Sequence, residues 1–245
     1  MATTDRSAGL IVVGNEILSG KVVDTNAPYL ARELRALGVE LRRIVTVPDE
    51  IAQIGVAVRE FSASFDWVFT SGGVGPTHDD VTMAGVAHGL DRPVIRHPLI
   101  EERLREFFKN KANDARLKMA EVPEGAELIL DPRLGFPTVT VENVYILPGI
   151  PSLFEQKFES LRERFATTPF VLRVIYTREG EGTIAEHLNA TLQAYPELQL
   201  GSYPKLGDPE YAVKLTLESK DATYVQAAFD HLLGLLPAEC VVRTE

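Results

Sequence analysis

The sequence predicts an α/β protein in which a mostly parallel sheet carries helices on both faces and is followed by a small α+β domain. Two observations lead to this prediction. From residue 9 to residue 111, short apolar strands alternate with amphipathic helices, which is the order that builds parallel sheets. From residue 170 onward the order becomes strand, helix, strand, strand, helix. We therefore predict two domains, residues 1–168 and 169–245.

Composition and charge exclude several functional classes. The chain has 245 residues, a formal net charge of −10 and a pI near 5.1, whereas proteins that bind nucleic acids or membrane surfaces present basic patches. No apolar run approaches the length of a membrane span, and residues 1–8 are too short and too polar for a signal peptide. We expect a cytoplasmic protein without nucleic-acid or membrane partners. The single Cys240 excludes an internal disulfide and is expected to be a small packed side chain.

Each element of the larger domain has its own signal. The run 9–13 is apolar throughout, as expected of a central strand that is covered on both faces. The helix from residue 27 has apolar side chains at helical spacing, with Pro28 in its first turn and Gly38 at its end. By the same criteria we expect strands at 39–47, 66–70 and 93–96, helices beginning at Pro48 and near Asp79, and a charged amphipathic helix at 98–111.

The pattern changes between residues 113 and 165. Short strands are expected at 127–130, 138–141 and 144–147. Only Glu142 and Asn143 separate the last two, and a two-residue connection indicates a hairpin, so one antiparallel excursion should extend the parallel sheet. Pro148, Gly149 and Pro151 then form a rigid turn before a helix that runs through Phe165. This turn is either one wall of a ligand cleft or a plain connection.

The last third of the chain predicts a small sheet with its helices on one face. We expect strands at 170–176, 198–203 and 211–217 and helices at 182–193 and 222–235. Acidic helices and the absence of a Gly-x-x-Gly clamp argue against RNA binding. Lys205 could reach a phosphate, but a lone surface lysine is more often solvated.

The stretch 69–82, FTSGGVGPTHDDVT, combines the end of a strand, three close glycines and two adjacent carboxylates. Gly72, Gly73 and Gly75 allow the backbone to approach a ligand closely, and a loop at the carboxyl end of a parallel strand can turn its N–H groups inward. The helix expected to begin near Asp79 adds the positive end of its dipole. The pattern therefore predicts a phosphate site.

Asp79 and Asp80 decide the kind of phosphate site. Two carboxylates repel a phosphate unless a cation stands between them, which predicts a divalent metal. A P-loop is excluded because no Lys-Ser/Thr pair follows Gly75, and the dinucleotide fingerprint fails because His78 replaces its third glycine. We expect His78 to point to solvent rather than to act as a general acid. The alternative is a tight turn in which Asp79 or Asp80 only caps the next helix.

A second polar loop, residues 14–26, follows the first strand. Glu16 lies just after the buried strand and has no evident structural role, so it is a functional candidate. Asp24, Thr25 or Asn26 could simply cap the helix that follows. Because the carboxyl ends of neighbouring parallel strands meet at one edge of a sheet, we expect Glu16 and Asp24 to reach the glycine loop.

Three segments carry a resemblance to a known family: GNEILSGKVVDTN at 14–26, TSGGVGPTHDDVT at 70–82 and NVYILPGIP at 143–151. They resemble the molybdopterin-binding-like domain of the CinA family, which is of the MoaB/MogA type, and are more similar still to the N-terminal domain of eukaryotic FAD synthases. Asn15 and residues 131–137 depart from the usual CinA pattern, whereas FPTVTVENVYILPGIP looks like the FAD synthase domain. The resemblance implies a MoaB/MogA-like fold and a homo-oligomer.

For these relatives, the resemblance implies metal-dependent hydrolysis of a nucleotide pyrophosphate, ADP-ribose or FAD, with magnesium or cobalt as the divalent ion and potassium as a further candidate. The departures from the CinA pattern favour FAD. The implied catalytic residues are Glu16, Asp24, Asp79 and Asp80, of which Glu16, Asp79 and Asp80 would bind metal. The implied binding residues are Asn15, Asn26, Ser71, Gly72, Gly73, Gly75, Pro76, Thr77, Thr82, Pro148 and Gly149.

Two other functions remain open at this point. One is a protein of molybdenum-cofactor synthesis that binds or adenylylates molybdopterin, although Asp24-Thr25-Asn26 replaces its expected Asp-x-Ser-Gly-type motif. The other is a non-catalytic sensor whose pocket binds a nucleotide. Appearance of product, rather than binding alone, distinguishes the three.

Overall fold

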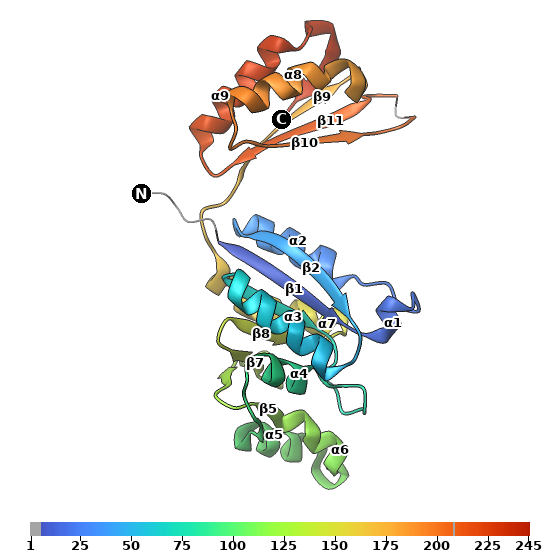
Figure 1. Ribbon diagram of the computed structural model, residues 1–245, viewed down its shortest axis with the longest axis vertical. Helices are drawn as coiled ribbons and strands as arrows, with labels where there is room; N and C mark the ends of the chain where they lie inside the picture. The colour runs from blue at the N-terminus through green and yellow to red at the C-terminus, as the bar shows by residue number, and fades with distance from the viewer. Residues whose placement is uncertain (1–5, 208) are drawn as a thin grey trace. The chain divides into compact units, whose positions relative to one another are not determined.

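The computed structural model describes residues 6–207 and 209–245. The chain divides into two compact units, residues 1–167 and 168–245 (Figure 1). This division lies one residue before the boundary that the sequence predicts. Across the described residues, we find no helix with the length and apolar character needed to cross a membrane.

The first unit is built on a six-stranded sheet. Its strand order is β2 (Glu40–Val47), β1 (Ser7–Val13), β3 (Trp67–Ser71), β8 (Val144–Leu147), β7 (Thr138–Val141) and β6 (Glu127–Ile129). The first four strands run parallel, and β7 and β6 are antiparallel additions. The mostly parallel sheet with one antiparallel excursion is thereby confirmed. Glu142, in the β7–β8 turn, has a φ of 53°, a left-handed conformation that tight hairpins require.

Helices cover both faces of this sheet, as predicted (Figure 1). Ile11 and Val13 of β1 pack with α3 (Ile51–Ser64), α4 (Thr82–Gly89) and α5 (Pro98–Phe108). Leu10 and Val12 point to the opposite face because side chains alternate along a strand. There they pack with α2 (Asn26–Ala36) and α7 (Pro151–Leu161), and the aromatic ring of Phe158 is fully buried among them. The short helices α6 (Asp114–Leu117), η1 (Lys109–Lys111), η2 (Lys118–Ala120) and η3 (Arg162–Phe165) complete the unit.

Three local expectations are wrong. A short helix, α1 (Asn15–Leu18), stands where a loop is expected. Helix α4 begins at Thr82 rather than near Asp79, because residues 77–80 form a turn of their own. Strand β4 (Val94–Arg96) does not join the central sheet but pairs with β5 (Glu121–Pro123) in a separate two-stranded ribbon.

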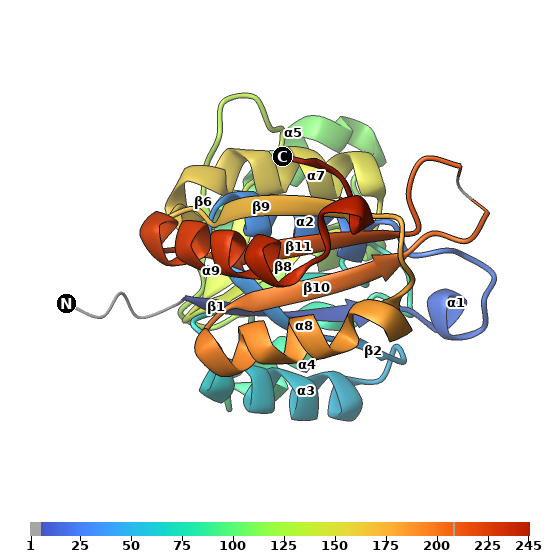
Figure 2. The same ribbon diagram turned by 90° about the horizontal axis from the view of Figure 1, so that it is seen from above.

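The second unit is an antiparallel sheet in the order β10 (Gln199–Pro204), β11 (Val213–Ser219), β9 (Val171–Thr177) and β12 (Val241–Thr244). Helices α8 (Glu181–Ala194) and α9 (Ala222–Leu235) pack on one face of it (Figure 2). The sequence prediction lacks β12 and the turn η4 (Ala238–Cys240) that leads into it. With β12 the order is βαββαβ, the ferredoxin-like arrangement. Cys240 is only 2% exposed, in line with a small packed side chain.

Candidate functional site

The loops after β1, β3 and β8 meet at the carboxyl edge of the parallel strands. Gly72 has a φ of 103°, and a Cβ atom there would lie 2.3 Å from the carbonyl oxygen of Val13. A Cβ at Gly149 would lie 3.2 Å from the Cα of Gly72. Only glycine permits the backbone conformation and the contact at Gly72, and at Gly149 a larger residue would be tight against Gly72. The glycines that the sequence singles out therefore allow three loops to touch.

The side chain of Asn26 connects the same three loops. It is 4% exposed, and its Nδ2 donates to Ser71 Oγ and to the carbonyl oxygen of Gly149, each at 2.9 Å. Asp24 in turn accepts a hydrogen bond from the backbone N–H of Asn26 at 2.9 Å and from that of Ala27 at 3.3 Å. Asp24 thus caps the start of α2, which is one of the two roles expected for it, and Asn26 fixes the loops.

A small cavity of about 100 Å³ lies where these loops meet. Both Glu16 and Asp24 line it together with Gly72, the proximity that neighbouring parallel strands predict. The predicted residues Asn26, Ser71 and Gly149 also contribute to its wall. Glu16 is exposed and its carboxylate lies over Gly14, where an added Cβ would come within 2.5 Å of Glu16 Oε1. Glu16 is therefore accessible to a ligand in this cavity.

In the glycine turn, residues 72–75, one backbone N–H group donates a hydrogen bond within the protein and the others are available to a ligand. Gly72 N–H donates to the carbonyl oxygen of Leu147 at 3.2 Å, so it is not available to a ligand. Thr82 stabilises the turn, because its hydroxyl donates to Gly72 O at 2.8 Å and its N–H to Gly73 O at 2.9 Å. Within the described part of the chain, the N–H groups of residues 73–75 have no hydrogen-bond acceptor. These three N–H groups are the candidates for binding a phosphate.

Thr77 brings the carboxylates of Asp79 and Asp80 together. Its hydroxyl oxygen lies 2.5 Å from Asp79 Oδ1 and 2.5 Å from Asp80 Oδ2, and its N–H donates to Asp80 Oδ2 at 2.8 Å. Neither aspartate caps α4, whose first turn has no side-chain cap. The hydrogen bond from Thr77 is the main cause that holds the pKa of Asp79 below its ordinary value, with smaller help from His78 and Lys118.

This pair of carboxylates fits a divalent cation that is completed by ligand oxygens. A hydroxyl has one proton, so Thr77 can satisfy only one of Asp79 and Asp80 at a time, and uncompensated negative charge remains. Magnesium is typically held by one or two carboxylates together with substrate phosphates. Asp79 and Asp80 would hold such an ion close to the N–H groups of residues 73–75, which are the candidates for binding a phosphate.

The predicted three-carboxylate metal set is not assembled. In the described ranges, no group of three or more His, Cys, Asp or Glu side chains is arranged to hold a metal. Asp80 turns back onto its own loop and lines a hollow with Gly75 and Lys118. Asp79, whose Oδ1 lies 2.5 Å from the same Thr77 hydroxyl oxygen, also lines an open hollow with Glu16 and Asp49. Glu16 is therefore a neighbour of Asp79 rather than a member of a preformed cage with both aspartates.

Two residues of the site escaped the sequence reasoning. Asp49 accepts a hydrogen bond from Asn15 N–H at 2.8 Å, so it fixes the start of α1 beside Glu16. It follows the carboxyl end of a parallel strand, which is a signal that could have identified it. Lys118 donates from Nζ to the carbonyl oxygens of Thr77 and Asp80, each at 2.9 Å. No sequence signal marks Lys118, because it belongs to a short helix far from the motifs.

The remaining predicted residues lie at the margins. Pro76 is exposed and makes the outer bend of the turn. His78 is also in solvent, as expected, with a side chain that is 98% exposed. Pro148 is buried and lines a different, apolar cavity, to which Val74 of the glycine turn also contributes.

Comparison with known proteins identifies both units. Residues 9–167 match the family described as probable molybdopterin binding domain, and residues 169–245 match the middle domain of FAD synthase. A protein of Archaeoglobus fulgidus is 38% identical over 228 residues, which are 92% of this chain and 97% of that protein.

Two further relatives carry descriptive names. A probable FAD synthase of Caenorhabditis briggsae is 31% identical over 96% of this chain, and this chain spans only 50% of its length. The crystal structure of the protein CinA from Thermoplasma acidophilum superposes with a TM-score of 0.61 at 32% identity, and covers 66% of this chain and 98% of that one.

Proposed function

This chain belongs to the family described as probable molybdopterin binding domain, joined to a FAD synthase middle domain. From that premise we propose that it is a metal-dependent pyrophosphatase for FAD or ADP-ribose-type dinucleotides. Relatives named as probable FAD synthases, of which it spans about half, support a nucleotide substrate. Their name is that of a synthase and belongs to proteins about twice as long as this chain, so the choice of hydrolysis is drawn from the site and not from the name.

One observation carries this proposal. The Thr77 hydroxyl holds the carboxylates of Asp79 and Asp80 side by side, directly after three N–H groups, at residues 73–75, that lack an acceptor within the described chain. A phosphate at these N–H groups would bring its negative charge close to the aspartates. A pyrophosphate and a divalent cation together satisfy both sets of groups, because the cation neutralises the carboxylates and the phosphates at once.

The chain's own groups divide the work as follows. The N–H groups of residues 73–75 would bind one phosphate, while Asp79 and Asp80 would hold the metal. When bound, the metal would neutralise charge on the phosphates and lower the pKa of a water molecule. Glu16, exposed at the cavity edge, would accept a proton from the attacking water, and Asp24 would orient that water.

The reaction is an ordinary hydrolysis and needs no redox partner. The oxygen of water forms a bond to one phosphorus, and the bond from that phosphorus to the bridging oxygen breaks. FAD would give FMN and AMP, and ADP-ribose would give AMP and ribose 5-phosphate. Water is the nucleophile in this scheme, so the reaction needs no covalent intermediate.

The match of residues 9–167 to the molybdopterin-binding family favours a second candidate. In that case the same turn would bind the phosphate of molybdopterin, and the protein would bind or adenylylate it. A third candidate is a sensor that binds a nucleotide without turning it over. We keep the homo-oligomer as part of the proposal, to be tested by light scattering.

One experiment separates the three candidates. Purified protein is incubated with FAD, with ADP-ribose, or with molybdopterin and adenosine triphosphate, with magnesium, with cobalt or with a chelator, and with or without potassium. FMN and AMP formed only when metal is present support the pyrophosphatase. Adenylylated molybdopterin supports the second candidate, and binding without any product in every mixture supports the sensor.

A further inference from the structure

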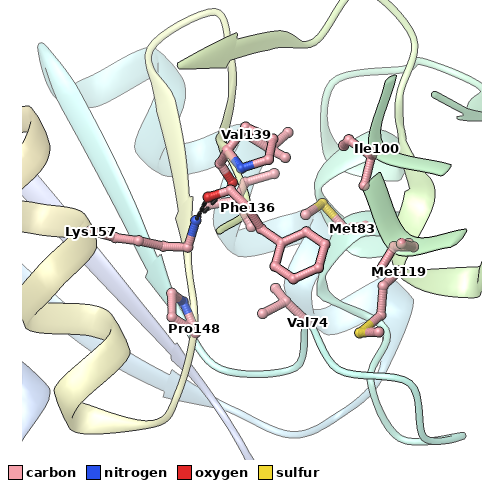
Figure 3. Close-up of a pocket in the computed structure, with 11 residues that line it drawn as sticks. Val74, Met83, Ile100, Met119, Phe136, Val139, Pro148 and Lys157 are labelled. Carbon is pink, nitrogen blue, oxygen red and sulfur yellow. Dashed lines mark hydrogen bonds between the residues drawn. The ribbon is translucent and has the colours of Figure 1, made fainter. Parts of the chain in front are cut away.

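A separate cavity of about 170 Å³ lies in the first unit beside the glycine turn. Figure 3 shows the ring of Phe136 pointing into it, with the side chains of Met83, Met119, Val74 and Ile100 around the ring. Among the eleven residues that line it, ten are apolar and the other is a lysine. The full lining is Val74, Met83, Ile100, Leu104, Met119, Phe136, Pro137, Val139, Ile146, Pro148 and Lys157.

Two observations place this cavity next to the glycine turn. Val74 belongs to the turn itself, and Pro148 immediately precedes Gly149, which touches Gly72. Met83 and Met119 line both this cavity and the hollow that contains Asp80. A ligand whose phosphate lies at the turn can therefore extend an adjoining group into the cavity.

The polarity of the cavity restricts what that group can be. Its single charged side chain, Lys157, uses its ammonium within the cavity wall, where Nζ donates to the carbonyl oxygens of Phe136 at 3.1 Å and Pro137 at 2.7 Å (Figure 3). The ammonium is therefore already paired with backbone carbonyl groups. A buried polar edge would find few partners here, and an unpaired polar group costs free energy. The cavity selects an apolar group.

The size of the cavity restricts the group further. An apolar protein cavity of about 150 Å³ is known to bind benzene, so about 170 Å³ has room for one benzenoid ring. Methionine sulfur and an aromatic side chain such as Phe136 both contact flat rings favourably. Pterin and adenine carry ring nitrogens and amino groups along their edges, whereas the dimethylbenzene edge of a flavin is a single apolar ring.

We propose that this cavity binds the dimethylbenzene edge of the flavin ring and is the determinant that selects FAD over ADP-ribose. The assignment rests on the proposed function, because it assumes that the dinucleotide phosphates lie at the glycine turn. ADP-ribose has a polar ribose and no aromatic ring in its second half, so it uses the turn and leaves the cavity empty. The two nucleotides therefore differ in their use of Phe136.

The test measures equilibrium binding of FAD and of ADP-ribose with magnesium present and with Glu16 replaced by glutamine in every protein compared, so that the cation stays in place and binding is read without turnover. Phe136→Ala removes the ring that faces the ligand, and we expect FAD to bind about fivefold more weakly, the magnitude of one aromatic contact, while ADP-ribose binding stays unchanged. Tyr203→Ala is the control. Tyr203 is an aromatic residue of β10 in the second unit, is 56% exposed and does not line the cavity, so both affinities should remain at the parent value.

A second variant fills the cavity instead of opening it. Val139→Phe adds a ring from β7 and should remove the preference for FAD, and the unchanged affinity for ADP-ribose shows that the fold is intact. Equal effects of Phe136→Ala on both nucleotides, or no preference for FAD in the parent protein, would overturn the assignment. If FAD binds with the expected pattern and the protein with Glu16 intact never forms product in the presence of metal, the proposed hydrolysis fails and the cavity assignment stands.

Discussion

The side-chain amide of Asn26 donates a hydrogen bond of 2.9 Å to the hydroxyl of Ser71, a residue 45 positions away in the sequence. Both residues are buried, with 4% and 2% of their surface exposed. The second amide hydrogen is used on Gly149 O. The Asn26 side chain thus fixes the three loops relative to one another, because both of its amide hydrogens are hydrogen-bonded to atoms of the site.

Replacing Asn26 with alanine should lower the free energy of unfolding by about 2 kcal/mol, because Ser71 Oγ and Gly149 O lose their buried donor. Urea denaturation checks this value. Asn15→Ala is the control, since Asn15 is exposed and only its backbone N–H is bonded in the site, and its effect should stay within about 0.5 kcal/mol. Equal losses in the two variants would mean that the amide does not connect the loops.

Removing the negative charge of Asp79 or Asp80 tests whether these residues bind a metal ion. Asp79→Asn and Asp80→Asn should each reduce hydrolysis of FAD, the stronger of the two by at least ~100-fold, which corresponds to about 2.7 kcal/mol at a transition state. Stability should change little, because an asparagine oxygen can still accept from Thr77. Asp91→Asn, at a side chain that is 83% exposed, serves as control and should retain the parent rate. Parent rates in both test variants would refute the metal site.

A methyl group at Gly73 should be poorly tolerated. Gly73 has a φ of 65°, and a Cβ there would lie 2.3 Å from Thr82 Oγ1, so Gly73→Ala should cost about 2 kcal/mol of unfolding free energy and disturb the N–H groups of the turn. The control is Gly182→Ala in α8, where an added Cβ meets no atom within 4 Å. Alanine is the better helix former, so this variant should gain about 0.5 to 1 kcal/mol, as read by thermal or urea unfolding.

Stability should depend on pH through Lys157. Burial lowers the pKa of this amine from 10.5 to about 8. Between these two values the unfolded chain binds more protons than the folded chain, so the free energy of unfolding rises with pH, by at most about 1.4 kcal/mol per pH unit. The cost of the buried ammonium is fully present below the folded pKa and disappears above the unfolded one.

Urea titrations across this pH range, on the parent and on Lys157→Met, measure the effect. The methionine variant should lose the rise, whereas the exposed Lys111→Met should keep the parent slope. A parent curve that coincides with that of Lys157→Met throughout would show that burial does not shift this amine.

Periodicity was sufficient to predict most of the fold. The apolar run that became β1 and the helical spacing that became α2 are local signals, and they hold because burial on both faces of a sheet agrees with them. The sequence prediction missed strand β12 because its four residues, Val241–Thr244, are partly exposed and combine apolar with polar side chains. Their pairing with β9 is what makes them a strand. The place of β4 beside β5 likewise depends on tertiary pairing rather than on either sequence.

The candidate site was predictable where it follows from topology. Strand ends next to each other in a parallel sheet bring Glu16, Asp24 and Gly72 to one cavity. The inward turn of Asp80 onto Thr77 was not predictable, because it is a local hydrogen-bond choice among several that an Asp-Asp pair can make. The role of Lys118 was not predictable either, because its hydrogen bond to Thr77 O joins two distant segments that no sequence motif connects.

The pairing of β3 with β8 also determines how late during synthesis the site can form. Val68 pairs with Val144, so the long segment between them must be synthesised and its ends brought together before the loops of the site can meet. Closing such a segment has an entropic cost, and non-local parallel pairing slows folding. An N-terminal fragment that ends before β8 would lack the partner of Gly72 and the acceptor on Gly149. On a ribosome the site would therefore form late, after α7 has emerged to cover its face of the sheet.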